Sequence, residues 1–327
     1  MRSRRAHLTI GLLLLTAVGC SSGDGPSSTP TSDVATTTAP TVPPTTTTVV
    51  PKATVVLDSP GAQPRQPLVL RMTAGSSAKV AMVSKVGLKL TIDGEATPMG
   101  VVPATRTVME QRVDRVDADG TAHFSVRFPE VSAVATPGAD PAAVQAAEEG
   151  LQSLKGVNGT GAVDVRGNVS DVIYDTRSVS DPNLKGTIDS LSSQLGNLSA
   201  PFPTEPVGVG ARWTVNSTAT IAGLKMTTTT HLTLRSRTGD RYELDQTQDG
   251  VAVPGPAAFP GMPIGAEASV TKFTLKSSGQ VTGDLTRQMP TKSSTKGTGD
   301  GTFAMSVSGQ KFTMVQNMTM DITTSPA

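Results

Sequence analysis

The regular alternation of apolar and polar residues over long stretches most constrains how this chain can fold. Between Lys79 and Ile92 the even positions are almost all apolar, while the odd positions are mostly polar or small. The even positions are Val80, Met82, Ser84, Val86, Leu88, Leu90 and Ile92. A period of two residues is that of a β-strand with one buried face. Strands that keep the other face in water are typical of antiparallel sheets.

The same alternation predicts further strands at 122–128, after an Asp/Gly-rich turn, and at 312–322. Only 3% of the residues are aromatic, so the core has to be built from Val, Leu, Ile, Met and Ala, with Trp213 and a few Phe. We therefore expect a mainly β protein of the α+β class.

Pairs of similar segments indicate an internal duplication. Val113–Phe128 and Leu232–Leu244 both read as strand, Asp/Gly turn and strand. A Gly-Asn or Gly-Gln pair lies between apolar residues in both Ala162–Asp171 and Phe273–Asp284. Such pairs are typical of the tight turns of β-hairpins. The sequence thus predicts a large curved antiparallel sheet from a duplicated β-unit, with halves at 54–200 and 201–327. The alternative is that Thr-rich hairpins resemble one another by chance.

Two amphipathic helices are predicted inside the first half. Asp140-Pro141 and Asp181-Pro182 each combine an N-cap residue with proline at the first helical position. Apolar residues then recur at helical spacing over 141–155 and 182–195. We expect both helices to pack on one face of the sheet.

The N-terminus has the pattern of a lipoprotein signal. Three arginines precede a short apolar run that ends at Cys20, the only cysteine. This run is too short to span a bilayer, which takes roughly 20 residues. We expect residues 1–19 to be the signal peptide and Cys20 to carry a diacylglycerol. An ordinary secretory signal is the alternative, because the third residue before Cys20 is Ala17, where lipoprotein signals more commonly have leucine.

Residues 20–53 are rich in Thr, Pro, Ser and Gly and cannot bury enough apolar surface to fold, so we expect a disordered tether behind the anchor. Cleavage before Cys20 removes three of the 28 basic side chains, leaving 25 against 27 acidic ones. This balance gives no electrostatic basis for nucleic-acid binding. The expected location is the outer face of the cytoplasmic membrane.

Sequence signals for catalysis are weak. His123 and His231 are expected to face solvent, and neither has metal-ligand residues at suitable spacing. Residues 297–301 (GTGDG) resemble a phosphate loop but lack the strand–helix context, and we interpret them as a flexible hairpin connection. We predict no catalytic residue, metal or cofactor, and no enzymatic activity.

Methionines are frequent in the predicted strands. Flexible Met side chains either fill an ordinary core or line an apolar cavity for acyl chains. The methionines in question are Met82, Met226, Met305, Met314, Met318 and Met320.

The segment from Pro206 to Trp213 reads Pro-Val-x-x-Gly-x-x-Trp and leads into a predicted strand. With the Asp-Ala-Asp-Gly turn of the first half, it resembles a cell-envelope lipoprotein family of actinobacterial type whose function is unknown. The resemblance covers roughly 68–325 and implies no activity or site residues. In architecture the chain is similar to lipoprotein carriers whose curved sheet holds a lipid under helices, which is a fold-level analogy.

The leading hypothesis is non-enzymatic binding of a lipid or another apolar envelope molecule between the sheet and the two helices. The expected apolar ligand face consists of Val86, Leu88, Leu90, Leu184, Ile188, Leu191, Met318 and Met320. The alternative is a structural or assembly module that acts through protein contacts. A hydrolase is a third reading, but the sequence offers no carboxylate pair at useful spacing.

Overall fold

The computed structural model describes residues 53–152, 154–175, 201–221, 224–257 and 265–327. The predicted signal peptide, Cys20, nearly all of the predicted tether and the second predicted helix, 182–195, lie outside the described residues.

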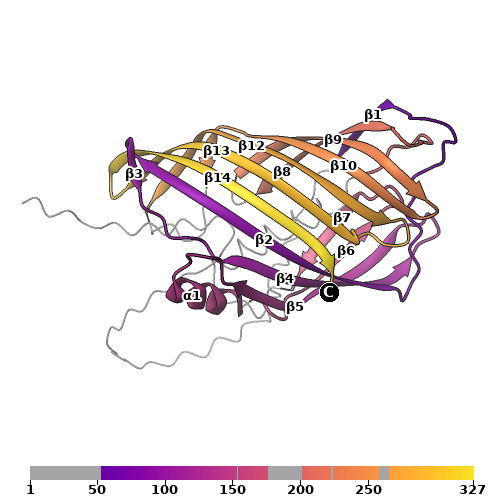
Figure 1. Cartoon of the computed structure of the whole chain (residues 1–327), viewed down its shortest axis with the longest axis horizontal. Helices are drawn as coiled ribbons and strands as arrows, with labels where there is room; N and C mark the ends of the chain where they lie inside the picture. The colour runs from indigo at the N-terminus through magenta and orange to yellow at the C-terminus, as the bar shows by residue number, and fades with distance from the viewer. Residues whose placement is uncertain (1–52, 153, 176–200, 222–223, 258–264) are drawn as a thin grey trace, which may run out of the picture.

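The described residues form one large antiparallel sheet of 14 strands, which confirms the mainly β prediction (Figure 1). Along its main path the strand order is β1-β8-β9-β10-β12-β13-β14-β2-β4-β5-β6-β7, with β3 added to β2 and β11 added to β12. The strands are β1 (Thr54–Ser59), β2 (Ser77–Ile92), β3 (Glu95–Thr97), β4 (Ala104–Val116), β5 (Ala122–Val134), β6 (Asn158–Val163), β7 (Val169–Tyr174), β8 (Arg212–Ile221), β9 (Leu224–Thr238), β10 (Arg241–Ala252), β11 (Gly255–Ala257), β12 (Glu267–Asp284), β13 (Lys292–Val307) and β14 (Gln310–Pro326).

Two meanders make up this sheet. In one, β2, β4, β5, β6 and β7 each pair with the next, and in the other β8 to β10 and β12 to β14 do the same. The two meanders join where β14 pairs with β2, while β1 extends the far edge at β8. The predicted halves are therefore continuous parts of one sheet.

The second pair of predicted hairpins is only half correct. Residues 162–171 do form the β6–β7 hairpin, but Gly279-Gln280 lies inside the long strand β12. Residues 297–301 are likewise the centre of β13 and not a hairpin connection. Continuous pairing of β13 with both neighbours keeps these glycines extended. The duplication of the β-unit stays a prediction. The presence of two meanders favours it, but the missing hairpin at 273–284 does not.

Within the described residues the structure contains one helix and not two. The helix α1 (Pro141–Gln152) begins as predicted, because the Asp140 carboxylate accepts a hydrogen bond from the Ala142 N–H at 2.9 Å. Ala147 and Leu151 are its buried residues, and α1 packs against β5. It does not cover the β2 residues Val86 to Leu90, because its buried face belongs to a different part of the core.

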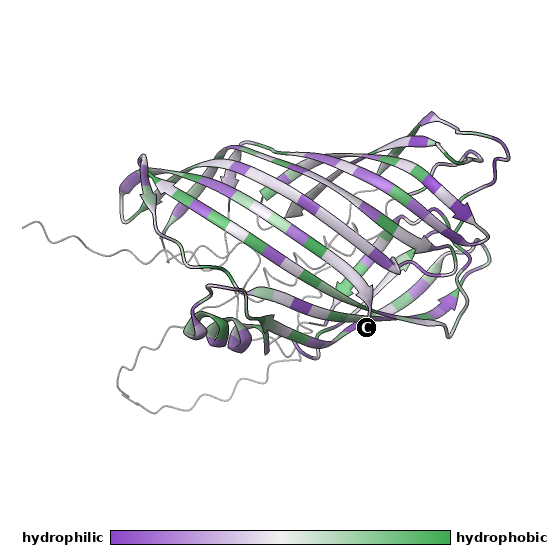
Figure 2. Ribbon diagram, in the orientation of Figure 1, coloured by the Kyte–Doolittle hydropathy of each residue, from purple (hydrophilic) through white to green (hydrophobic). Residues whose placement is uncertain are grey.

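The core consists of two apolar clusters. The first cluster joins the two ends of the sheet, since it includes Trp213 of β8, Phe124 of β5 and Val169 of β7. The second cluster is formed by the ends of the central strands and includes Leu90, Phe303 and Met314. Hydropathy alternates along the strands, as expected for a sheet with one buried face (Figure 2).

The Pro-Val-x-x-Gly-x-x-Trp segment has a structural role. Val207 forms a two-way backbone bridge with Gln66, with N–O distances of 2.9 and 3.0 Å. Gly210 has a φ of +82°, a conformation that glycine adopts without steric cost. Trp213 is fully buried, and its indole N–H donates to the Pro201 carbonyl at 3.1 Å. The segment thus fixes residues 60–66 against the start of the second meander.

We expect Gly208→Ala to lower the free energy of unfolding by about 1–3 kcal/mol. A Cβ at Gly208 would lie 1.8 Å from the Ala62 carbonyl oxygen, so the backbone has to move. The matched control is Gly100→Ala, because nothing lies within 4 Å of a Cβ there. Urea unfolding of both variants measures the difference, and equal stability of the two would contradict the close approach.

Candidate apolar binding face

Five of the residues predicted for a ligand face come together in the second cluster. Met318 of β14 lies opposite Leu88 of β2, and Met320 lies opposite Val86. Leu90 is buried on the same side of β2, and the other four are buried or half-buried. Residues directly opposite in an antiparallel pair share one face and touch. Leu184, Ile188 and Leu191 lie outside the described residues.

Aromatic and sulfur-containing side chains extend this face across the neighbouring strands. Phe273 of β12 and Phe303 of β13 have ring centroids 6.3 Å apart. The buried members of the second cluster are Leu90, Leu224, Met226, Ala252, Ala268, Val270, Phe273, Leu275, Phe303, Met305, Met314 and Met318. No Asp, Glu, Lys, Arg or His side chain is buried among the described residues, so the interior at this surface favours uncharged, apolar groups. Below, this surface, with Val86, Leu88 and Met320, is called the apolar face.

Glycines in β13 allow the large side chains of this face to lie against the backbone. Gly299 pairs with Met318 and Gly301 with Phe273, so both glycines belong to the apolar face. A Cβ at Gly301 would come within 2.7 Å of the rings of Phe273 and Phe303. The alternating glycines Gly299 and Gly301 therefore leave room for the large side chains that face them.

Gln316 is the residue of this face that sequence analysis missed. It occupies the inward position between Met314 and Met318, and it is fully buried. Neither Nε2 nor Oε1 of its amide has a hydrogen-bond partner among the described residues. An unpaired buried polar group costs about 1–3 kcal/mol. The sequence feature that could have revealed Gln316 is that it is the one polar residue in an otherwise apolar alternating series. The series is Phe312, Met314, Gln316, Met318 and Met320.

Polar side chains on the same side of the sheet lie between the two clusters and are paired. Gln246 lies opposite Leu232, a buried member of the first cluster, and donates to Thr295 Oγ1 at 3.1 Å. Gln248 lies opposite Thr230 and donates to its hydroxyl at 3.4 Å. Inward-facing amides here are thus satisfied by hydroxyl groups, in contrast to Gln316.

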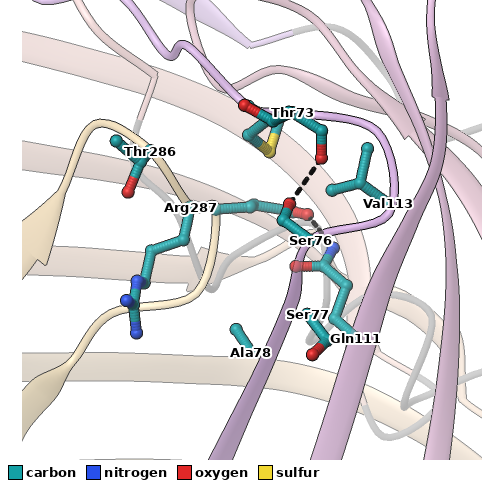
Figure 3. A pocket seen from close by; sticks show the side chains of 10 residues that line it. Thr73, Ser76, Ser77, Ala78, Gln111, Val113, Thr286 and Arg287 are labelled. Atoms are coloured by element: carbon teal, nitrogen blue, oxygen red, sulfur yellow. Dashed lines mark hydrogen bonds between the residues drawn. The ribbon is translucent and has the colours of Figure 1, made fainter.

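A separate pocket lies between residues 72–78, β4 and residues 286–288 (Figure 3). Gln111 donates to Gln288 within its lining, and the Ser76 hydroxyl donates to the Thr73 carbonyl at 2.6 Å. Its volume is about 120 Å³. Pockets for drug-sized ligands usually measure about 300–1,000 Å³, so this pocket is too small to hold a lipid or a ligand of that size.

The histidines have structural partners and differ in exposure. His123 lies on the side of β5 opposite the buried Phe124, as predicted, but is half-buried, and its Nε2 lies 2.8 Å from Asp117 Oδ2 in the β4–β5 turn. His231 is exposed as predicted, with Nδ1 3.0 Å from Thr214 Oγ1. Among the described residues no group of three His, Cys, Asp or Glu side chains is arranged to hold a metal ion.

The ionisable groups with displaced pKa values lie outside the apolar face. Hydrogen bonds from Thr286 lower the pKa of Asp284, and a hydrogen bond from Arg127 lowers that of Glu110. Burial raises the pKa of Tyr174 and of Tyr242. A carboxyl that acts as a general acid near neutral pH needs a raised pKa, and these two carboxylates have the opposite shift.

Comparisons with known proteins do not assign the chain to a group. No family model matches it, and no curated protein shows significant similarity to it. Within the described residues no helix is both long and apolar enough to cross a membrane.

We expect Gly301→Ala to destabilise the protein by about 1–3 kcal/mol, because the new methyl group would displace two packed rings. Gly87→Ala is the matched control on the outward side of β2. There the nearest atom to a new Cβ is the Thr319 hydroxyl, at 2.6 Å, and that side chain can rotate away. Thermal unfolding compares them, and a larger loss for Gly87→Ala would mean that the packed side of the sheet is misassigned.

Proposed function

We propose that the protein is a lipoprotein anchored through Cys20 on the outer face of the cytoplasmic membrane, where its sheet binds a lipid or another apolar molecule. The proposal includes no enzymatic activity, no cofactor and no nucleic-acid partner. Residues 20–53 would hold the folded part away from the membrane surface.

The observation that carries the proposal is the apolar face itself. It combines methionines with two phenylalanines on the central strands, and no Asp, Glu, Lys, Arg or His side chain is buried among the described residues. Flexible methionines adapt to ligands of variable shape. Leu88 and Met320 are only half-buried, so this face still has surface to offer to a ligand.

A structural or assembly role through protein contacts is the second candidate. The observation that favours it is the edge of the sheet at β1, which pairs only with β8 among the described strands. Val56 of this edge strand is 49% exposed. An open edge can pair with a strand from another chain.

We expect Leu88→Gln to reduce the lipid that co-purifies with the protein from its native host to less than about a fifth, because the polar side chain replaces an apolar contact surface of the ligand. Lys89→Gln introduces the same side chain at the neighbouring exposed position and should leave the lipid content unchanged. Mass spectrometry of organic extracts measures both, with circular dichroism as a check on folding. Wild-type protein that carries no lipid, and that crosslinks to a partner protein, would favour the second candidate.

The anchor has its own test. We expect Cys20→Ala to move the protein from the membrane pellet to the soluble fraction, because the acyl chains are attached through that thiol. Immunoblots of fractionated cells measure the distribution. Continued sedimentation of the variant with membranes would show that another feature holds the protein there.

A further inference from the structure

Gln316 lies among residues of the apolar face, and its amide has no hydrogen-bond partner among the described residues. In register it lies opposite Leu90 of β2 and opposite Gly301 of β13, and its own strand places Met314 and Met318 on either side. Its side chain is fully buried, and neither atom of the amide is hydrogen-bonded among the described residues. The amide therefore presents one acceptor and an NH₂ donor to its apolar surroundings.

The inward-facing amides of the nearby strand β10 are paired. Gln246 and Gln248 also face inward from β10, and each is hydrogen-bonded to a threonine hydroxyl. A buried amide without a partner is rare in folded proteins and calls for a specific reason. A ligand that brings its own polar group to Gln316 supplies that reason.

We propose that Gln316 recognises the hydroxyl group of a neutral, long-chain amphiphile, such as a long-chain alcohol or an acylglycerol, bound on the apolar face. This inference rests on the proposed function and specifies its ligand. A hydroxyl both donates and accepts, so it can satisfy the amide oxygen and the amide nitrogen together. An ionised head group is disfavoured, because no charged side chain is buried among the described residues to compensate it.

The test uses the full-length protein and a neutral dye, N-phenyl-1-naphthylamine, displaced by 1-decanol or by 1-chlorodecane. The two competitors have the same chain length and differ in the hydroxyl group. We expect Gln316→Leu to lower the preference for 1-decanol over 1-chlorodecane by about tenfold, which corresponds to two lost hydrogen bonds. Comparing the ratio between variants removes the intrinsic difference in hydrophobicity of the competitors.

Gln246→Leu is the matched control, because it removes an inward amide that is already paired. We expect it to leave the preference unchanged and to lower the midpoint of urea unfolding, since Thr295 loses its partner. Gln316→Leu should instead raise the midpoint in the absence of ligand, because leucine replaces an unpaired amide.

The outcomes separate this inference from the proposed function. An unchanged preference in Gln316→Leu, or a lowered unfolding midpoint that reveals a partner within the chain, overturns the role of Gln316. Displacement of the dye by both compounds would still support apolar binding in that case. Failure of the wild-type protein to bind the dye or either compound would refute the binding function itself.

Discussion

The packing of the first cluster between the two ends of the sheet is the constraint on which the rest of the structure depends. A twisted sheet rarely extends beyond about ten strands without curling or splitting, and this one has 14. Its ends meet through Trp213 and Leu234 on one side and Phe124 and Val163 on the other. This contact turns one face of every strand inward, and the apolar face of the second cluster is a consequence of that curvature.

Polar groups of the connecting segments hold these ends in place. The Arg166 guanidinium donates to the carbonyl groups of Leu68, Pro203 and Thr204, at 3.3, 2.8 and 2.9 Å. The Phe202 N–H in turn donates to the Arg166 carbonyl at 2.8 Å. One arginine after β6 thereby ties together two segments that are distant in sequence. Carbonyl groups that would otherwise be left unpaired next to the core are satisfied in this way.

Local patterns in the sequence predicted much of this fold. Alternation located β2, β5 and β14, and the Asp140-Pro141 pair located the start of α1, because each signal depends only on neighbouring residues. The same patterns misplaced Gly279 and residues 297–301, which were interpreted as turns. Glycine in a strand and glycine in a turn look alike until the facing side chains, such as Phe273, are known. The pairing of β14 with β2 depends on contacts distant in sequence and was not predicted, and Gln316 became notable only when its neighbours were found to be apolar.

The pairing of β14 with β2 has a consequence for the order of folding. Most of the described chain separates these two strands, so their pairing closes a long stretch of sequence. Non-local pairing of this kind slows folding and leaves strand edges exposed while it is incomplete. During that interval Leu88 and Leu90 are accessible to any apolar molecule nearby. Docking of β14 onto β2 therefore completes the sheet and the apolar face together, because Met318 and Met320 then lie opposite Leu88 and Val86.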